Sequence, residues 1–157
     1  MKTLFALSCL VLGISACQST TSSEESTTPV IINGTWQLVS NVIITKGDTV
    51  VAYPVKGQND VMIKLFNDSH FSFFRHDTLQ GKTAKPVYDT GAGTYTLVGD
   101  DYTEKLTYCN YRNWENHEFK FKLTVKGDTL RQQGIEKIDS LNVDREIIET
   151  YVRLNTK

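Results

Sequence analysis

A carboxylate set among aromatic and aliphatic side chains is the residue of this sequence with the clearest potential for ligand binding. In the predicted strand that ends at Tyr108, Tyr102, Glu104 and Leu106 share one face with Tyr108. If that face lines a cavity, Glu104 needs a partner to remain ionised, and a ligand or an arginine would supply one. A structural salt bridge and a position at the rim of the cavity are the alternatives.

Three further residues are candidate ligand contacts, each with an ordinary structural alternative. His70 follows a tight turn and could reach a ligand, or it could be a hydrogen-bonded structural histidine. Arg131 could neutralise Glu104 or bind an anionic head group, although an exposed strand arginine is commoner. Trp114 lies with Tyr111 in the polar segment 110–116, where the two rings could line the mouth of a cavity or fold back over the core.

The motifs of common enzyme classes are absent from the sequence. There is no Gly-x-Ser-x-Gly, phosphate loop or Cys-x-x-Cys, and Gly91-Ala92-Gly93 lacks the third glycine of a dinucleotide site. His70 and His76 would lie about 20 Å apart along a strand, too far to share a metal. We predict no catalytic residue, metal or cofactor, and keep a hydrolase or isomerase as a weaker alternative.

The first residues predict export and anchoring. Residues 1–16 contain Lys2 and a short apolar run, as in a signal peptide, and they end before Cys17. Ile14-Ser15-Ala16-Cys17 resembles the bacterial lipobox, which implies cleavage before Cys17 and attachment of acyl chains such as palmitate to it. An ordinary secretory peptide with a chance cysteine is the alternative.

The mature chain then divides into an anchor with a tether and one domain. Residues 17–29 are rich in Ser, Thr and Glu and predict a flexible linker, and residues 30–157 have the length of one domain. With Cys9 removed and Cys17 lipidated, Cys109 is left without a disulfide partner. The mature net charge of about −2 argues against nucleic acid as a partner. We expect a lipid-anchored protein of the bacterial cell envelope, at the outer membrane, on a side that the sequence does not reveal.

The domain carries an all-β pattern. In residues 118–125, apolar side chains alternate with Glu, Lys and Thr, as in an antiparallel sheet with one face on a core. Short Gly-Asp turns at 46–49, 98–101 and 126–129 predict antiparallel hairpins. Residues 78–89 predict a polar loop, and residues 139–144 at most one helical turn. Strands are predicted at 35–43, 49–53, 61–66, 70–75, 93–98, 102–109, 118–125, 129–138 and 146–154.

About nine strands in an up-and-down meander favour a closed barrel, with a sandwich as the alternative. The opening Asn33-Gly34-Thr35-Trp36 resembles the Gly-x-Trp start of the lipocalin and calycin barrels, and Tyr151-Val152-Arg153 resembles their basic C-terminal strand. Segments 68–71, 93–95 and 102–104 are similar to bacterial lipocalin-like lipoproteins. The resemblance implies a lipocalin-like barrel of about 8–10 strands, in which Trp36 caps the closed end and Arg153 packs across it.

This resemblance implies the binding or carriage of a small, partly apolar or amphipathic molecule. Glu104 and Tyr102, with His70, Arg131, Tyr108 and Trp114 as further candidates, would fix its polar end. The alternative is a structural or protein-interaction module whose barrel is filled by its own aromatic side chains. The sequence names neither the ligand nor the oligomeric state.

Overall fold

A computed structural model describes residues 31–154, which form nine strands and two short 3-10 helices. The helices, η1 (Arg112–Trp114) and η2 (Asp139–Leu141), each make one turn between strands. The strands are β1 (Gly34–Thr45), β2 (Asp48–Tyr53), β3 (Asp60–Phe66), β4 (His70–Asp77), β5 (Tyr88–Val98), β6 (Asp101–Cys109), β7 (His117–Lys126), β8 (Thr129–Ile138) and β9 (Val143–Arg153).

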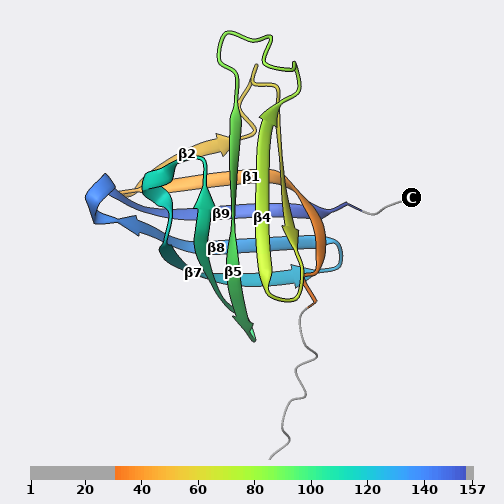
Figure 1. Cartoon of the computed structure of the whole chain (residues 1–157), viewed down its shortest axis with the longest axis vertical. Coiled ribbons are helices and arrows are strands. Elements are labelled where there is room, and N and C mark those ends of the chain that lie inside the picture. Colours follow the sequence, from red (N-terminus) through yellow and green to blue (C-terminus); the bar gives the residue numbers. More distant parts are fainter. Residues whose placement is uncertain (1–30, 155–157) are drawn as a thin grey trace, which may run out of the picture.

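The strands form a closed antiparallel meander. From β3 to β9 each strand pairs with the next, and β9 returns to pair with β1. β2 pairs with the second half of β1 and β3 with its first half, so β2 and β3 act as one barrel strand interrupted by residues 54–59. The result is the predicted all-β barrel, which is closed and has eight strands. In Figure 1, β4 and β5 lie on one side of the barrel and run nearly at right angles to β7, β8 and β9 on the other side. Sequential hairpins close the barrel because each short turn places the next strand antiparallel beside the last.

The glycine turns have the expected backbone conformation. Gly47, Gly99 and Gly127 have φ angles of 91°, 62° and 58°. This region suits glycine because a Cβ atom disfavours positive φ in other residues. These turns explain why the strand predictions are close to the observed strands.

β5 begins earlier than predicted, at Tyr88 instead of residue 93. The discrepancy comes from Gly91 and Gly93, because glycine is normally depleted from strands. Here a Cβ on Gly91 would lie 2.6 Å from the Phe73 ring, and one on Gly93 would collide with the carbonyl of Lys105. Both glycines are therefore required by close packing inside a regular strand.

A β-bulge in β6 corrects one predicted face. Ala92 pairs with Tyr108 but Gly93 pairs with Leu106, so one extra residue is inserted in β6 at Thr107. The bulge reverses the alternation of side chains, turns Cys109 inward and leaves Tyr108 68% exposed. The prediction that Tyr108 shares a face with Tyr102, Glu104 and Leu106 is therefore wrong.

The two ends of the barrel differ in their connections. At the turn end lie the Gly-Asp turns 99–100 and 127–128, the turn 67–69 and the start of β1. At the loop end lie η1, η2 and the longer loops 54–59 and 78–87. We call the interior next to each end the turn half and the loop half.

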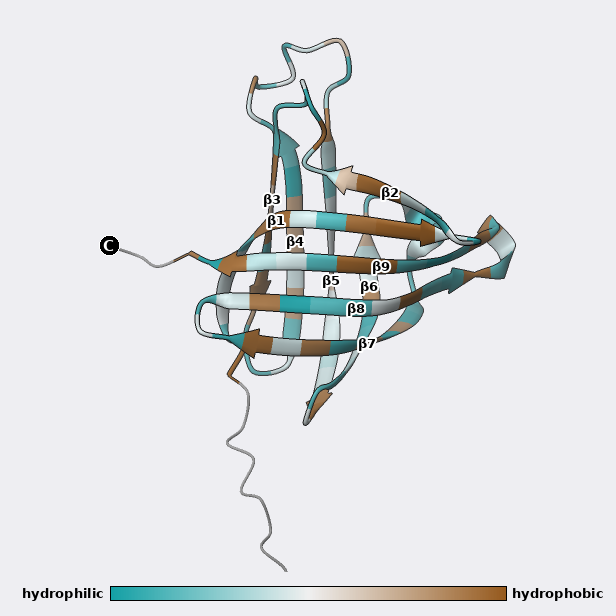
Figure 2. Ribbon diagram, turned by 180° about the vertical axis from the view of Figure 1, so that it is seen from behind, coloured by the Kyte–Doolittle hydropathy of each residue, from teal (hydrophilic) through white to brown (hydrophobic). Residues whose placement is uncertain are grey.

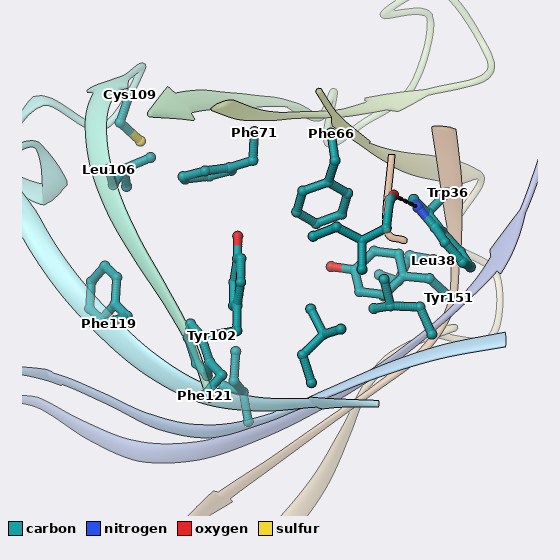
Figure 3. Packing of buried hydrophobic residues seen from close by; sticks show 14 of the residues in the cluster. Trp36, Leu38, Phe66, Phe71, Tyr102, Leu106, Cys109, Phe119, Phe121 and Tyr151 are labelled. Atoms are coloured by element: carbon teal, nitrogen blue, oxygen red, sulfur yellow. Dashed lines mark hydrogen bonds between the residues drawn. The ribbon is translucent and has the colours of Figure 1, made fainter. Parts of the chain in front are cut away.

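The turn half is filled by side chains. Trp36, Tyr102 and Tyr151 are each 0% exposed, and Figure 3 shows their rings with those of Phe66 and Phe71 inside the barrel. The Tyr102 ring centroid lies 6.0 Å from that of Phe66. Figure 2 shows the alternation of hydrophobic and hydrophilic residues along β7. Aromatic packing of this kind removes the turn half from water.

The predicted signal peptide, Cys17 and the linker lie outside the described residues. Within residues 31–154, no helix combines the length and the apolar character needed to cross a membrane.

Candidate functional site

A cluster of polar side chains crosses the barrel interior between the two halves. Five strands contribute to it. Each has an inward-facing polar residue whose nearest inward-facing neighbours on the same strand are apolar. We call it the interior polar cluster, and its members are Asn41 (β1), Lys64 (β3), Glu104 (β6), Gln132 (β8) and Glu149 (β9).

Lys64 is the cation of the cluster and donates two hydrogen bonds within it. Its side chain is 3% exposed, and Nζ donates to Glu104 Oε2 at 2.8 Å and to Gln132 Oε1 at 3.0 Å. Nζ also lies 5.1–5.5 Å from the ring centroids of Phe66, Phe71 and Tyr102. Such rings attract a desolvated ammonium, and the pair with Glu104 supplies the opposite charge.

Tyr102 completes the environment of Glu104. Its hydroxyl donates to Glu104 Oε2 at 2.8 Å, so this oxygen accepts hydrogen bonds from both Lys64 and Tyr102. Burial, followed by the nearby Glu104 carboxylate, raises the pKa of Tyr102 well above its usual value. Tyr102 therefore acts as a neutral hydrogen-bond donor to a paired carboxylate.

Glu149 is the other carboxyl group of the cluster and has neutral neighbours. The Tyr151 hydroxyl donates to Oε2 at 2.7 Å, and Asn41 Nδ2 donates to Oε1 at 3.2 Å. Burial raises the pKa of Glu149 from 4.5 to about 7, against the opposing effect of Lys64. No cation in residues 31–154 forms a salt bridge with this carboxylate, so the effect of burial prevails.

The loop half carries its own ion pairs, which are nearer to solvent. Arg145 contacts Glu136 Oε2 with two nitrogens, at 2.7 and 2.6 Å, and lies 5.6 Å from the Trp114 ring centroid. Burial raises the pKa of Glu136, and Arg145 opposes that shift. Across the loop half, Arg75 pairs with Asp60. The Arg145 side chain is 32% exposed, so water reaches this part of the interior.

Apolar side chains lie between these ion pairs. Met62, Phe73 and Trp114 are partly buried and pack against Leu106, Phe119 and other core residues. A separate hollow of about 380 Å³ lies among the long loops. It is lined by residues 55–60 and parts of 77–87, and Met62, Phe73 and Trp114 do not line it. The loop half thus combines partly accessible apolar surface with charged groups, which is the composition of small-molecule sites.

The structure brings some of the predicted site residues together. Glu104 and Tyr102 lie in the interior polar cluster, in direct contact. Trp114 lies at the loop end, where it covers Phe119 at a centroid distance of 6.0 Å. Tyr111, by contrast, is exposed and donates to Asp89 at the rim.

Other predicted site residues lie on the outside. His70 is exposed at the first position of β4, where its Nδ1 lies 2.8 Å from the hydroxyl of Ser69. Arg131 is exposed because the register of β8 turns Leu130 and Gln132 inward. Arg131 therefore does not neutralise Glu104, and Lys64 does so instead. Tyr108 points outward because the bulge in β6 reverses the alternation of side chains after Leu106.

Sequence reasoning missed four members of the interior polar cluster: Lys64, Glu149, Asn41 and Gln132. The signal that identified Glu104, a charged residue in phase with large apolar neighbours, was also present for two of them. Lys64 is in phase with Met62 and Phe66, and Glu149 with Ile147 and Tyr151. Asn41 carried no such signal, because a bulge between Leu38 and Ser40 shifts the alternation before it.

Trp36 and Arg153 meet at the turn end. The guanidinium carbon of Arg153 lies 4.0 Å from the Trp36 ring centroid, and Arg153 Nη1 donates to the carbonyl of Asn33 at 2.7 Å. The indole N–H of Trp36 donates to the carbonyl of Ile32 at 2.7 Å, a bond that Figure 3 marks. These bonds attach the segment before β1 to the end of β9.

Residues 31–154 contain no group of three or more His, Cys, Asp or Glu side chains positioned to hold a metal ion.

A family model described as a lipocalin-like domain matches residues 32–140. Among solved structures, the chain is similar to an uncharacterized protein from Bacteroides eggerthii, with 14% identity and a TM-score of 0.43. That alignment covers 78% of this chain and 98% of the other. No curated protein matches the sequence.

Proposed function

Since the chain belongs to the lipocalin-like domain family, we propose that it binds or carries a small, partly apolar molecule inside its barrel. The ligand's apolar part packs in the loop half, and its polar end meets the interior polar cluster. An eight-stranded barrel is wide enough for one small ligand or for its own side chains. The position of the ligand therefore depends on which part of the interior the protein leaves accessible.

The observation that carries this proposal is a difference in exposure between particular inward side chains of the two halves. Trp36 and Tyr102 are 0% exposed in the turn half, whereas the Arg145 side chain is 32% exposed in the loop half. The partly buried Met62, Phe73 and Trp114 lie in the accessible half. Burying these surfaces against an apolar ligand contributes about 25 cal/mol per Å² of area removed from water.

The lipid anchor belongs to the same proposal. We place the protein in the bacterial cell envelope, held at the outer membrane by acyl chains on Cys17 and separated from it by the linker 17–29. The support is the lipobox-like segment that ends in Cys17. Mass spectrometry of the mature N-terminus, with Cys17→Ser as control, tests it: an acylated Cys17 is expected, and an unmodified cysteine contradicts it.

A filled barrel that acts as a structural or interaction module is the second candidate. The fully buried Trp36, Tyr102 and Tyr151 favour it, because their rings fill the centre of the turn half. The two candidates therefore differ only in the state of the loop half.

Native mass spectrometry of the full chain carrying Cys17→Ser separates these candidates. Incubation with an envelope lipid extract is expected to give a bound mass that is lost on denaturation. Met62→Trp should remove that mass by filling the loop half, whereas Val98→Trp, at an exposed outward position, should leave it unchanged. An apo mass for every variant would favour the filled barrel.

A further inference from the structure

The interior cations are already matched by carboxylates. Lys64 is bound by Glu104, and Arg145 is bound twice by Glu136. Arg75 pairs with Asp60, whose side chain is 2% exposed. An anionic head group would therefore have to displace a protein carboxylate to reach any of these cations.

Two interior acceptor groups, in contrast, lack a full set of partners. Glu149 accepts hydrogen bonds from the two neutral donors described above and forms no salt bridge of its own, and the nearby charge of Lys64 is already paired with Glu104. Asn41 Oδ1 is buried and accepts no hydrogen bond from any group in residues 31–154. The two side chains are joined through Asn41 Nδ2, so the unmatched charge and the unmatched acceptor lie at one place in the barrel. A buried acceptor without a donor is costly, and a ligand that supplies donors removes that cost.

We infer that the barrel selects ligands whose polar end is a hydrogen-bond-donating cation, such as a primary ammonium group, and that this end binds to Glu149 and Asn41. The inference rests on the proposed function, since it names the ligand class of the same interior. Charge complementarity carries it: the interior polar cluster holds two carboxyl groups, Glu104 and Glu149, and one cation, Lys64. An ammonium supplies both the missing charge and up to three donors.

In the absence of ligand, a proton bound to Glu149 neutralises its charge and supplies a hydrogen-bond donor. Burial raises the pKa of Glu149 to about 7, so a proton and an ammonium compete for this carboxylate. Protonated Glu149 can donate to Asn41 Oδ1 after the amide turns, which satisfies the unpartnered oxygen. The groups facing Glu149 are Asn41 from β1, Lys64 from β3, Glu104 from β6, Gln132 and Glu136 from β8, and Tyr151 from β9 itself.

This competition gives ligand binding a pH dependence of known sign. Only the ionised form of Glu149 accepts the ammonium, and its fraction falls from about nine-tenths at pH 8 to about one-tenth at pH 6. The dissociation constant of a cationic ligand should therefore rise about tenfold between pH 8 and pH 6. An anionic ligand should show no such loss.

The test uses three amphiphiles with the same alkyl chain. Binding of dodecylamine, dodecyltrimethylammonium and dodecanoate to the full chain with Cys17→Ser is measured by calorimetry at pH 8 and pH 6. Dodecylamine is expected to bind at least about tenfold more tightly than dodecanoate at pH 8. Dodecyltrimethylammonium, which has the charge but no N–H donor, should fall between them.

Glu149→Gln is the decisive variant, and Glu146→Gln is its control on the same strand. The amide introduced by Glu149→Gln supplies a donor to Asn41 and removes the charge, so the preference for dodecylamine and its pH dependence should both disappear. Glu146 lies on the outward face of β9, bonded to Gln133, and its substitution should change neither. A carboxyl-carbon NMR titration of Glu149 in the free protein should show an inflection near pH 7, which Glu149→Gln abolishes.

Two results would overturn the inference while leaving the proposed function intact. One is dodecanoate binding as tightly as dodecylamine at pH 8. The other is a preference for dodecylamine that Glu149→Gln leaves unchanged. Binding of none of the amphiphiles at either pH would instead count against the proposed function and remove the basis of the head-group preference with it.

Discussion

The turn half and the loop half of the barrel are built from the same strands but are filled differently. In the turn half, aromatic rings from β1, β4, β6 and β9 exclude water, and Trp36 is sealed by Arg153. In the loop half, ion pairs such as Arg145–Glu136 and partly exposed apolar side chains share the space. We therefore expect the turn half to contribute more to stability than the loop half, where the proposed ligand would bind. The interior polar cluster is the boundary between them.

The largest expected effect is the removal of a ring from the turn half. Trp36→Ala should lower the free energy of unfolding by about 4 kcal/mol, because the cavity cannot collapse among buried neighbours. Trp114→Ala in the loop half should cost about 1 kcal/mol, since its ring is only partly buried. Urea denaturation measures both variants. Equal losses would show that the halves do not differ in their contribution to stability.

The second effect concerns the boundary. Lys64→Met leaves Glu104 buried without its cation and should cost about 3 kcal/mol at neutral pH. Adding Glu104→Leu should recover most of that loss, because the unpaired charge is then removed as well. Chemical denaturation of the two single variants and the double variant forms the cycle. A double variant less stable than Lys64→Met would contradict this account.

The third effect contrasts the two carboxyl groups of the boundary. The pKa of Glu149 is raised in the folded state, so the folded protein holds a proton more tightly than the unfolded chain between about pH 4.5 and 7. Stability from this group is therefore present at low pH and lost as the pH rises through that window. Glu149→Gln should be more stable than the wild type by on the order of 2 kcal/mol at pH 8 and about equal at pH 5. Unfolding curves at both pH values measure this, and Glu104→Gln should destabilise instead.

The smallest expected effect concerns the contact between Arg153 and Trp36 at the turn end of the barrel. Arg153→Lys keeps the charge but loses the planar stack on Trp36, and should cost about 1 kcal/mol. Thermal unfolding of this variant beside Arg131→Lys, an exposed strand arginine, isolates the stack. A shift no larger than that of the control would mean that the stack contributes little to stability.

Much of the barrel follows from local sequence, because alternation and Gly-Asp turns determine hairpins one at a time. The start of β5 could not be predicted in this way. Gly91 and Gly93 are required there because Phe73 and Lys105, on neighbouring strands, leave no room for a Cβ atom. The face of Tyr108 depends on a bulge that alternation cannot reveal. Glu104 was identified as an inward carboxylate candidate, yet its partner Lys64 lies 40 positions away and is set by barrel closure. Contacts across the interior are therefore the part that pattern reading could not supply.

The pairing of β1 with β9 also has a consequence for the order of folding. Asn33 and Arg153, joined by a hydrogen bond, are 120 positions apart, so the barrel cannot close until the last strand is available. Until then, β1 and β8 each present an unpaired edge, and the pocket for Trp36 is incomplete. Such distant contacts make folding slow relative to helical proteins of this size. A chain that ends before β9 should therefore remain open and prone to association, and full-length chains should acquire Trp36 burial late, in the same kinetic phase as closure.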